Sequence, residues 1–185
     1  MLINICYFIL DGMLMTTEAG AYKMATFSDE HMNRLFEKFV LEYYRVHHKE
    51  LAASPDHIQW NITDPDDAVI DFLPSMKTDI TLHKGDRTLI IDTKYYGRMM
   101  QEQFDKQTIH SGNLYQVFTY IKNLDKCNTG LVSGMLLYAK TQESIAPDLD
   151  AHFGPNRIMV RTLDLNQEFD EIRKQLDGFA ETIEQ

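Results

Sequence analysis

Apolar residues between residues 28 and 51 recur at the spacing of an α-helix. They fall three or four positions apart and form one stripe, made of Met32, Leu35, Phe36, Phe39, Val40 and Tyr43. Ser28 or Asp29 can cap the helix at its start, where acidic residues also suit the positive end of the helix dipole. The pattern therefore predicts an amphipathic helix over residues 28–51.

The same spacing predicts two further helices. One runs from residue 113 to about 123 and the other over residues 166–184; their apolar faces consist of Leu114, Val117, Phe118 and Ile121, and of Phe169, Ile172, Leu176, Phe179 and Ile183. The stretch 97–112, "GRMMQEQFDKQTIHSG", lacks a clear period. We interpret it as a polar connection with some helix.

Strand patterns occupy the rest of the chain. Residues 76–96, "MKTDITLHKGDRTLIIDTKYY", read as a hairpin, and residues 129–140 form a nearly continuous apolar run typical of a buried strand. Residues 156–165 alternate, and part of 54–67, such as "HIQWNI", can be a strand. The order helix, strands, helix, strand, strand, helix predicts an α/β domain with a mixed central β-sheet flanked by α-helices.

The turn of the hairpin decides which side chains share a face. We place it at Lys84 and Gly85, because glycine readily supplies the positive φ that such turns need. A loop of two or four residues gives the same register, which pairs Asp79 with Ile90 and Lys77 with Asp92. Since side chains alternate between faces, Asp79, Asp92 and Lys94 then project from one face. A loop of three or five residues would break this arrangement.

Charges at the end of a buried strand are costly unless they are paired or bind an ion. One explanation is a salt-bridged hairpin, in which Lys77 and Lys94 neutralise Asp79 and Asp92. The other is a metal site, because two carboxylates beside a lysine can hold Mg²⁺ for phosphodiester hydrolysis. Spacing alone leaves both open.

Length and composition restrict the class of protein. The 185 residues fit one domain, residues 1–185, with a poorly defined N-terminal segment over 1–27. The apolar opening covers about ten residues, too few to span a bilayer, so we expect no membrane association. Cys6 and Cys127 form no CxxC pair, which favours a cytoplasmic protein. The formal net charge of −10 disfavours unaided DNA binding.

Four blocks in order, "LFEKFV", "TDITL", "LIIDTKYY" and "NLYQVFTY", resemble the McrC family of the McrBC modification-dependent restriction system. That family belongs to the PD-(D/E)xK nuclease superfamily. The resemblance implies a restriction-endonuclease-like core. Thr78 replaces the proline of the motif, a residue that shapes the backbone and ligates nothing.

The resemblance also implies site residues. Asp79 matches the first metal-binding aspartate, and Asp92 and Lys94 match the second motif, with the Thr93 backbone carbonyl as an extra metal ligand. Glu37 matches the acidic residue of the preceding helix, a further metal ligand. On the helix that follows the hairpin, Gln116 matches a catalytic glutamine that orients the lysine or contacts a phosphate. Tyr120, on the same helix, is a candidate for DNA contact. Apart from the resemblance, Arg98 is a further candidate, because its positive charge suits the DNA backbone.

The implied function is a Mg²⁺-dependent DNA endonuclease, with Mn²⁺ able to substitute, acting as the cleavage component of a 5-methylcytosine-dependent restriction system. Its partners would be DNA and an AAA+ GTPase motor of the McrB type. McrC-like proteins dock that motor through a long N-terminal region, whereas about 27 residues precede the first helix here, so we expect that docking region to be absent. The alternatives are a stand-alone PD-(D/E)xK repair or recombination nuclease and a non-catalytic assembly module with the same fold.

Overall fold

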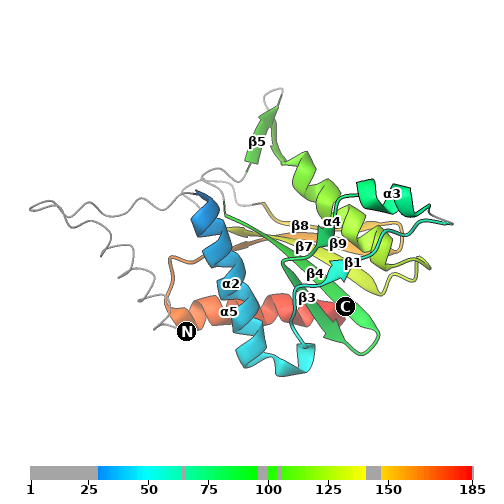
Figure 1. Cartoon of the computed structure of the whole chain (residues 1–185). Coiled ribbons are helices and arrows are strands. Elements are labelled where there is room, and N and C mark those ends of the chain that lie inside the picture. The colour runs from blue at the N-terminus through cyan, green and yellow to red at the C-terminus, as the bar shows by residue number, and fades with distance from the viewer. Residues whose placement is uncertain (1–28, 64–65, 96–99, 104–105, 141–146, 185) are drawn as a thin grey trace, which may run out of the picture.

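The computed structural model describes residues 29–63, 66–95, 100–103, 106–140 and 147–184. The predicted N-terminal segment, residues 1–27, lies outside them. The described elements follow in the order α2 (Asp29–His47), η1 (Lys49–Leu51), β1 (His57–Ile58), α3 (Asp67–Phe72), β2 (Met76–Lys77), β3 (Ile80–Lys84), β4 (Arg87–Lys94), β5 (Met100–Gln103), β6 (Lys106–Ile109), α4 (Ser111–Leu124), β7 (Val132–Ala139), β8 (Leu149–Phe153), β9 (Asn156–Leu163), α5 (Phe169–Glu181) and η2 (Thr182–Glu184) (Figure 1).

Five of these strands form the central sheet, in the order β3-β4-β7-β9-β8. The inner strands β4, β7 and β9 run parallel, while β3 and β8 pair antiparallel at the two edges. Parallel strands need crossover connections, and α4 supplies the one between β4 and β7. The mixed sheet predicted from the sequence is confirmed.

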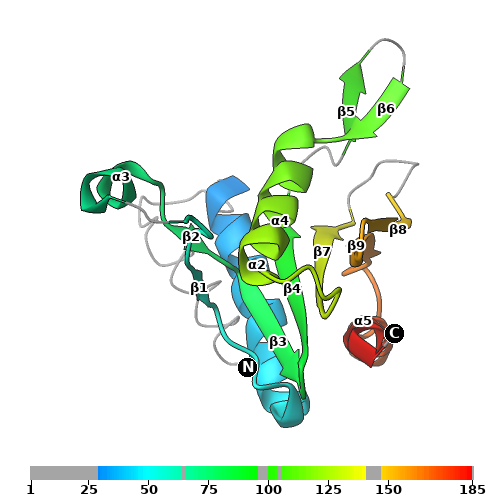
Figure 2. The same ribbon diagram turned by 90° about the vertical axis from the view of Figure 1, so that its right-hand side faces the viewer.

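Helices cover both faces of this sheet (Figures 1 and 2). Buried side chains of α2 and α5 share one cluster with one face of β3, β4, β7 and β9. Side chains of α4 form a second cluster with the opposite face, where Ile90 of β4 and Leu136 of β7 point. The resulting layers of helix, sheet and helix fit the restriction-endonuclease-like core that we expected.

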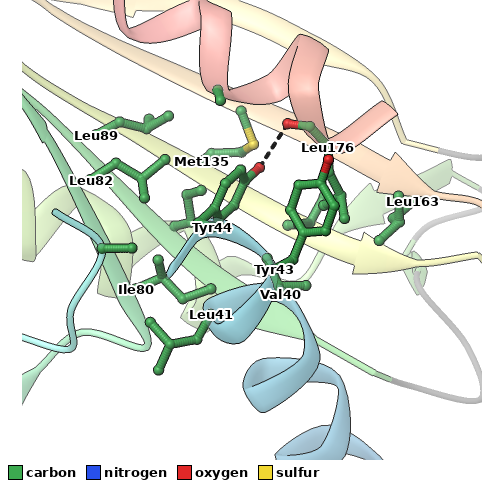
Figure 3. Packing of buried hydrophobic residues seen from close by; sticks show 14 of the residues in the cluster. Val40, Leu41, Tyr43, Tyr44, Ile80, Leu82, Leu89, Met135, Leu163 and Leu176 are labelled. Carbon is green, nitrogen blue, oxygen red and sulfur yellow. Dashed lines mark hydrogen bonds between the residues drawn. The ribbon is translucent and has the colours of Figure 1, made fainter. Parts of the chain in front are cut away.

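The cluster under α2 is closed by polar links as well as by apolar packing (Figure 3). The hydroxyl of buried Tyr44 donates to the main-chain carbonyl of Leu176 in α5 at 3.0 Å. Its neighbour Tyr43 donates to the carboxylate of Asp177. Since buried hydroxyls are costly without a partner, these bonds fix the position of α5 on α2.

The hairpin turn lies one residue later than predicted. Gly85 and Asp86 form it, and Lys84 pairs with Arg87. Gly85 takes the first turn position with a φ of 61°, a conformation that residues with a side chain rarely adopt. The predicted register is therefore wrong by two residues, and Thr81 rather than Asp79 pairs with Ile90. A shift of two keeps the side chains of the paired residues on their predicted faces, but Asp79 lies in a bend outside the ladder and is not placed by it.

The first strand of the hairpin is broken, so the predicted pair of Lys77 with Asp92 is wrong too. Lys77 belongs to β2 and pairs with His57 of β1. The break follows from Thr78, whose main-chain N–H donates to the carbonyl of Asp56 at 2.9 Å and draws the chain away from β4.

Residues 97–112 also differ from the prediction. Their described part forms the antiparallel pair β5 and β6, in which Met100 pairs with Ile109 and Gln103 with Lys106, and α4 begins at Ser111. Figure 2 shows this pair projecting beyond the start of α4. The predicted helix over 166–184 is confirmed as α5 followed by η2, whereas α3 and β8 were not predicted. Among the described helices, none is long and apolar enough to cross a membrane.

Candidate active site

The end of β4 brings an aspartate and a lysine together inside the protein. Asp92 is 1% exposed, and the Nζ atom of Lys94 lies 2.6 Å from its Oδ2 atom as an ion pair. Neither carboxylate oxygen of Asp92 has a hydrogen bond of good geometry within the described chain. A buried carboxylate whose single partner is one ammonium group is incompletely satisfied, because its other oxygen lacks a donor.

This environment changes the acidity of Asp92. Burial disfavours the charged form and raises the pKa of Asp92, as the negative charge of Asp79 also does, to a net value of about 7. The ammonium of Lys94 acts in the opposite direction. A cation placed beside Asp92 would therefore relieve an electrostatic cost that Lys94 offsets only in part.

Asp79 lies in a bend between β2 and β3 and reaches the same end of β4. Its Oδ2 atom accepts two hydrogen bonds from Thr93, one from the main-chain N–H at 2.8 Å and one from the side-chain hydroxyl at 2.9 Å. These contacts attach the first acid of the motif to the residue that follows the second one.

Glu37 approaches the aspartates from α2. Its side chain is partly buried; burial raises the pKa of Glu37, as does the charge of Asp79, while Lys77 and Lys94 lower it. One turn earlier on the helix, the Oδ1 atom of Asn33 accepts a hydrogen bond from the main-chain N–H of Tyr95 at 2.9 Å. This bond holds the helix that carries Glu37 against the end of β4.

The other face of the site is supplied by α4. The Nζ atom of Lys94 lies 3.4 Å from Oε1 of Gln116, whose Nε2 donates to the hydroxyl of Tyr120 at 2.9 Å. The Tyr120 hydroxyl in turn donates to the carbonyl of Lys77 at 3.0 Å. The Gln116 side chain thus contacts the lysine, one of the two contacts that the resemblance implied, and Tyr120 is a buried residue in the same chain of contacts.

The structure brings Glu37, Asp79, Asp92, Thr93, Lys94, Gln116 and Tyr120 to one end of β4. Arg98 lies outside the described residues. Among the residues that are described, no group of three or more His, Cys, Asp and Glu side chains is arranged as a ready metal site. The oxygen donors present, carboxylates above all, are of the type that hard divalent cations prefer.

Two features of the site were not predicted from the sequence. One is the Thr93 side chain, for which only a backbone role was predicted. The other is Asn33, four residues before Glu37 and so on the same side of α2. The spacing of four residues could have indicated that Asn33 lies near Glu37. The main-chain N–H that donates to the Asn33 amide oxygen, however, depends on how α2 packs on the sheet.

Comparison with known proteins identifies the family of this chain. The family model of the McrBC 5-methylcytosine restriction system component matches residues 1–139. The Type IV methyl-directed restriction enzyme EcoKMcrBC of Escherichia coli strain K12 is 28% identical over 145 residues, which cover 77% of this chain and 42% of that protein. The chain thus spans less than half the length of this relative. Because the family model covers most of the chain, the chain belongs to the family of McrBC 5-methylcytosine restriction system components.

Proposed function

We propose that this chain is the metal-dependent DNA endonuclease component of a modification-dependent restriction system. The observation that carries the proposal is the buried Asp92 carboxylate at the end of β4, in a member of the McrBC family; it lies 2.6 Å from Lys94 and has no second polar partner among the described residues. A structural salt bridge would be expected to satisfy its remaining carboxylate oxygen with a donor. A site for a cation leaves that oxygen free.

The cofactor in this proposal is Mg²⁺, with Mn²⁺ as a substitute. Asp79 and Asp92 would hold it, with Glu37 and the Thr93 carbonyl as further oxygen donors. When bound, such an ion lowers the pKa of a coordinated water and offsets charge on a phosphate. The fit rests on the chemistry of the donors and on the unsatisfied Asp92 oxygen.

Lys94 has a separate task. Its ammonium is held by Asp92 on one side and lies near Gln116 on the other, and its side chain is 11% exposed. An ammonium fixed at the edge of a carboxylate site can donate hydrogen bonds to a phosphodiester oxygen and stabilise the charge that develops as the P–O bond breaks. Gln116 and Tyr120 limit the directions that this ammonium can take.

The partners proposed are DNA and a GTPase motor of the McrB type. The net charge of −10 agrees with a cleavage component that relies on a second protein for most of its DNA affinity. The related Escherichia coli protein is described as methyl-directed, and the family description names 5-methylcytosine, which makes this base the first modification to test.

Cleavage assays test the proposal. DNA with and without 5-methylcytosine is incubated with the chain and Mg²⁺, in the presence and absence of a McrB-type GTPase and GTP. We expect cleavage of methylated DNA that requires Mg²⁺, the motor and GTP, and none by Lys94→Ala. Cleavage independent of motor and GTP would instead indicate a stand-alone nuclease. No cleavage under any condition, with a motor shown to bind the chain, would indicate a non-catalytic module.

A further inference from the structure

Thr93 makes two contacts with a single oxygen atom. Its main-chain N–H and its hydroxyl both donate to Oδ2 of Asp79, at 2.8 and 2.9 Å, and the residue is fully buried. Two donors that converge on one carboxylate oxygen fix both the rotation of the side chain and the identity of the occupied oxygen. The other oxygen, Oδ1, is then the one left for a cation.

We propose that Thr93 is the positioning residue of the site, and that its hydroxyl orients Asp79 so that Oδ1 serves as a single-oxygen ligand for a divalent cation. This inference rests on the proposed function. It assigns to the side chain of Thr93 a role distinct from that of its carbonyl. Partners that orient a metal ligand in this way commonly change metal affinity by about 10- to 100-fold when they are removed.

The need for such a contact follows from where Asp79 lies. Asp92 sits within a central strand and is held by burial, whereas Asp79 occupies a bend outside the ladder of β3 and β4. The preceding residue, Thr78, is attached to Asp56 and not to β4. A side chain on a bend has several staggered rotamers available, and the two bonds from Thr93 select one of them.

The residue type suits this task. Threonine is β-branched, which favours a strand position and a restricted χ1 angle, and it carries a hydroxyl donor. Thr93→Val keeps the shape and the main-chain donor but removes the hydroxyl, and Thr93→Ser keeps the hydroxyl. The pair of variants therefore separates the hydrogen bond from the packing.

The first experiment measures the contact without metal. Urea unfolding midpoints are compared in EDTA for wild type, Thr93→Val, Asp79→Ala and the double variant. We expect the double variant to lose less stability than the sum of the two single losses, because the contact can be removed only once. If the stability losses of the two single variants add up to that of the double variant, the Thr93 hydroxyl and Asp79 do not interact and the proposal is overturned.

The second experiment measures the role toward the cation. Mn²⁺ is added to wild type and to each variant while the midpoint of thermal unfolding is measured. The site-dead control, which lacks both aspartates, is the double variant Asp79→Ala, Asp92→Ala. We expect the Mn²⁺ concentration for half-maximal stabilisation to be about 10- to 100-fold higher for Thr93→Val than for wild type, and near wild type for Thr93→Ser.

The outcomes separate the two claims. If Mn²⁺ stabilises wild type and Thr93→Val alike, the positioning role is overturned while the proposed metal site stands. If Mn²⁺ stabilises wild type no more than the site-dead control, both the metal site and the positioning role are overturned, even if the unfolding cycle shows coupling. A selective loss in Thr93→Val, with rescue by Thr93→Ser, establishes the role.

Discussion

Asp92 is the residue at which stability and activity oppose each other. Burial raises its pKa to about 7 in the folded protein, well above the value of an exposed aspartate. The folded state therefore prefers the protonated form. Stability from this group is fully present below pH 4 and is lost as the pH rises toward and through 7, where the buried charge must form. A metal-binding aspartate, in contrast, has to be ionised.

The first prediction is a pH-dependent gain from Asp92→Asn, which removes the ionisation while keeping the size of the side chain. In EDTA, the free energy of unfolding of the variant relative to wild type should increase by about 2 kcal/mol between pH 5.5 and pH 8. Urea unfolding at the two pH values measures it. A difference between variant and wild type that does not change with pH would show that Asp92 titrates normally.

At the scale of residues, the sequence predicts the contacts that depend only on the alternation of side chains between the two faces of a strand. Asp92 and Lys94 are two positions apart on one strand, so they share a face whatever the register with the neighbouring strand. They form an ion pair at 2.6 Å. Asn33 and the Thr93 hydroxyl could not be assigned in that way. Their partners, Tyr95 and Asp79, are set by how a helix and a bend pack onto β4.

At the scale of elements, the helices and the buried strands were predictable and the polar pieces were not. Strand β7 is buried along nearly its whole length, so its apolar run identified it. Strands β5 and β6 consist mainly of polar residues with no alternating apolar positions, so no period marked them. Likewise, the break after Lys77 arises from the pairing of Thr78 with Asp56, 22 residues away, which local patterns do not contain.

Close packing of α4 on β7 positions the helix that carries Gln116. Gly134 in β7 lies under this helix, and a Cβ atom added there would meet Val117 Cγ1 and would lie 2.7 Å from Ile121 Cδ1. The absence of a side chain at this position therefore allows α4 to lie close to the sheet.

The second prediction is that Gly134→Ala destabilises the protein by about 1–3 kcal/mol, because the added methyl group overpacks the contact between helix and sheet. Urea unfolding measures the change. Gly178→Ala in α5 is the matched control, since nothing lies within 4 Å of the added Cβ there. The control should be stabilising by about 0.5–1 kcal/mol, because alanine is the better helix former. A neutral Gly134→Ala would show that α4 has room to move.

At the scale of the whole molecule, the end of the central strand β4 contacts helices on both faces of the sheet. Strand β4 has an edge hairpin partner in β3 and a parallel neighbour in β7, so its last residues meet α2 and α4 together. The acids Glu37, Asp79 and Asp92 come from three separate stretches of sequence and converge only through this arrangement. The net charge of −10 adds to their mutual repulsion, which a bound cation would relieve.

Calorimetric titration of the full chain with Mn²⁺ at pH 7.5 tests most directly whether the end of β4 binds a metal ion. We expect wild type to bind, and the Asp79→Asn, Asp92→Asn double variant to show no binding heat. The control double variant Asp71→Asn, Asp86→Asn removes the same two charges at exposed positions and should bind like wild type. Equal binding by wild type and the Asp79, Asp92 variant, or no binding by wild type, would contradict the assignment of a metal-dependent centre to the end of β4.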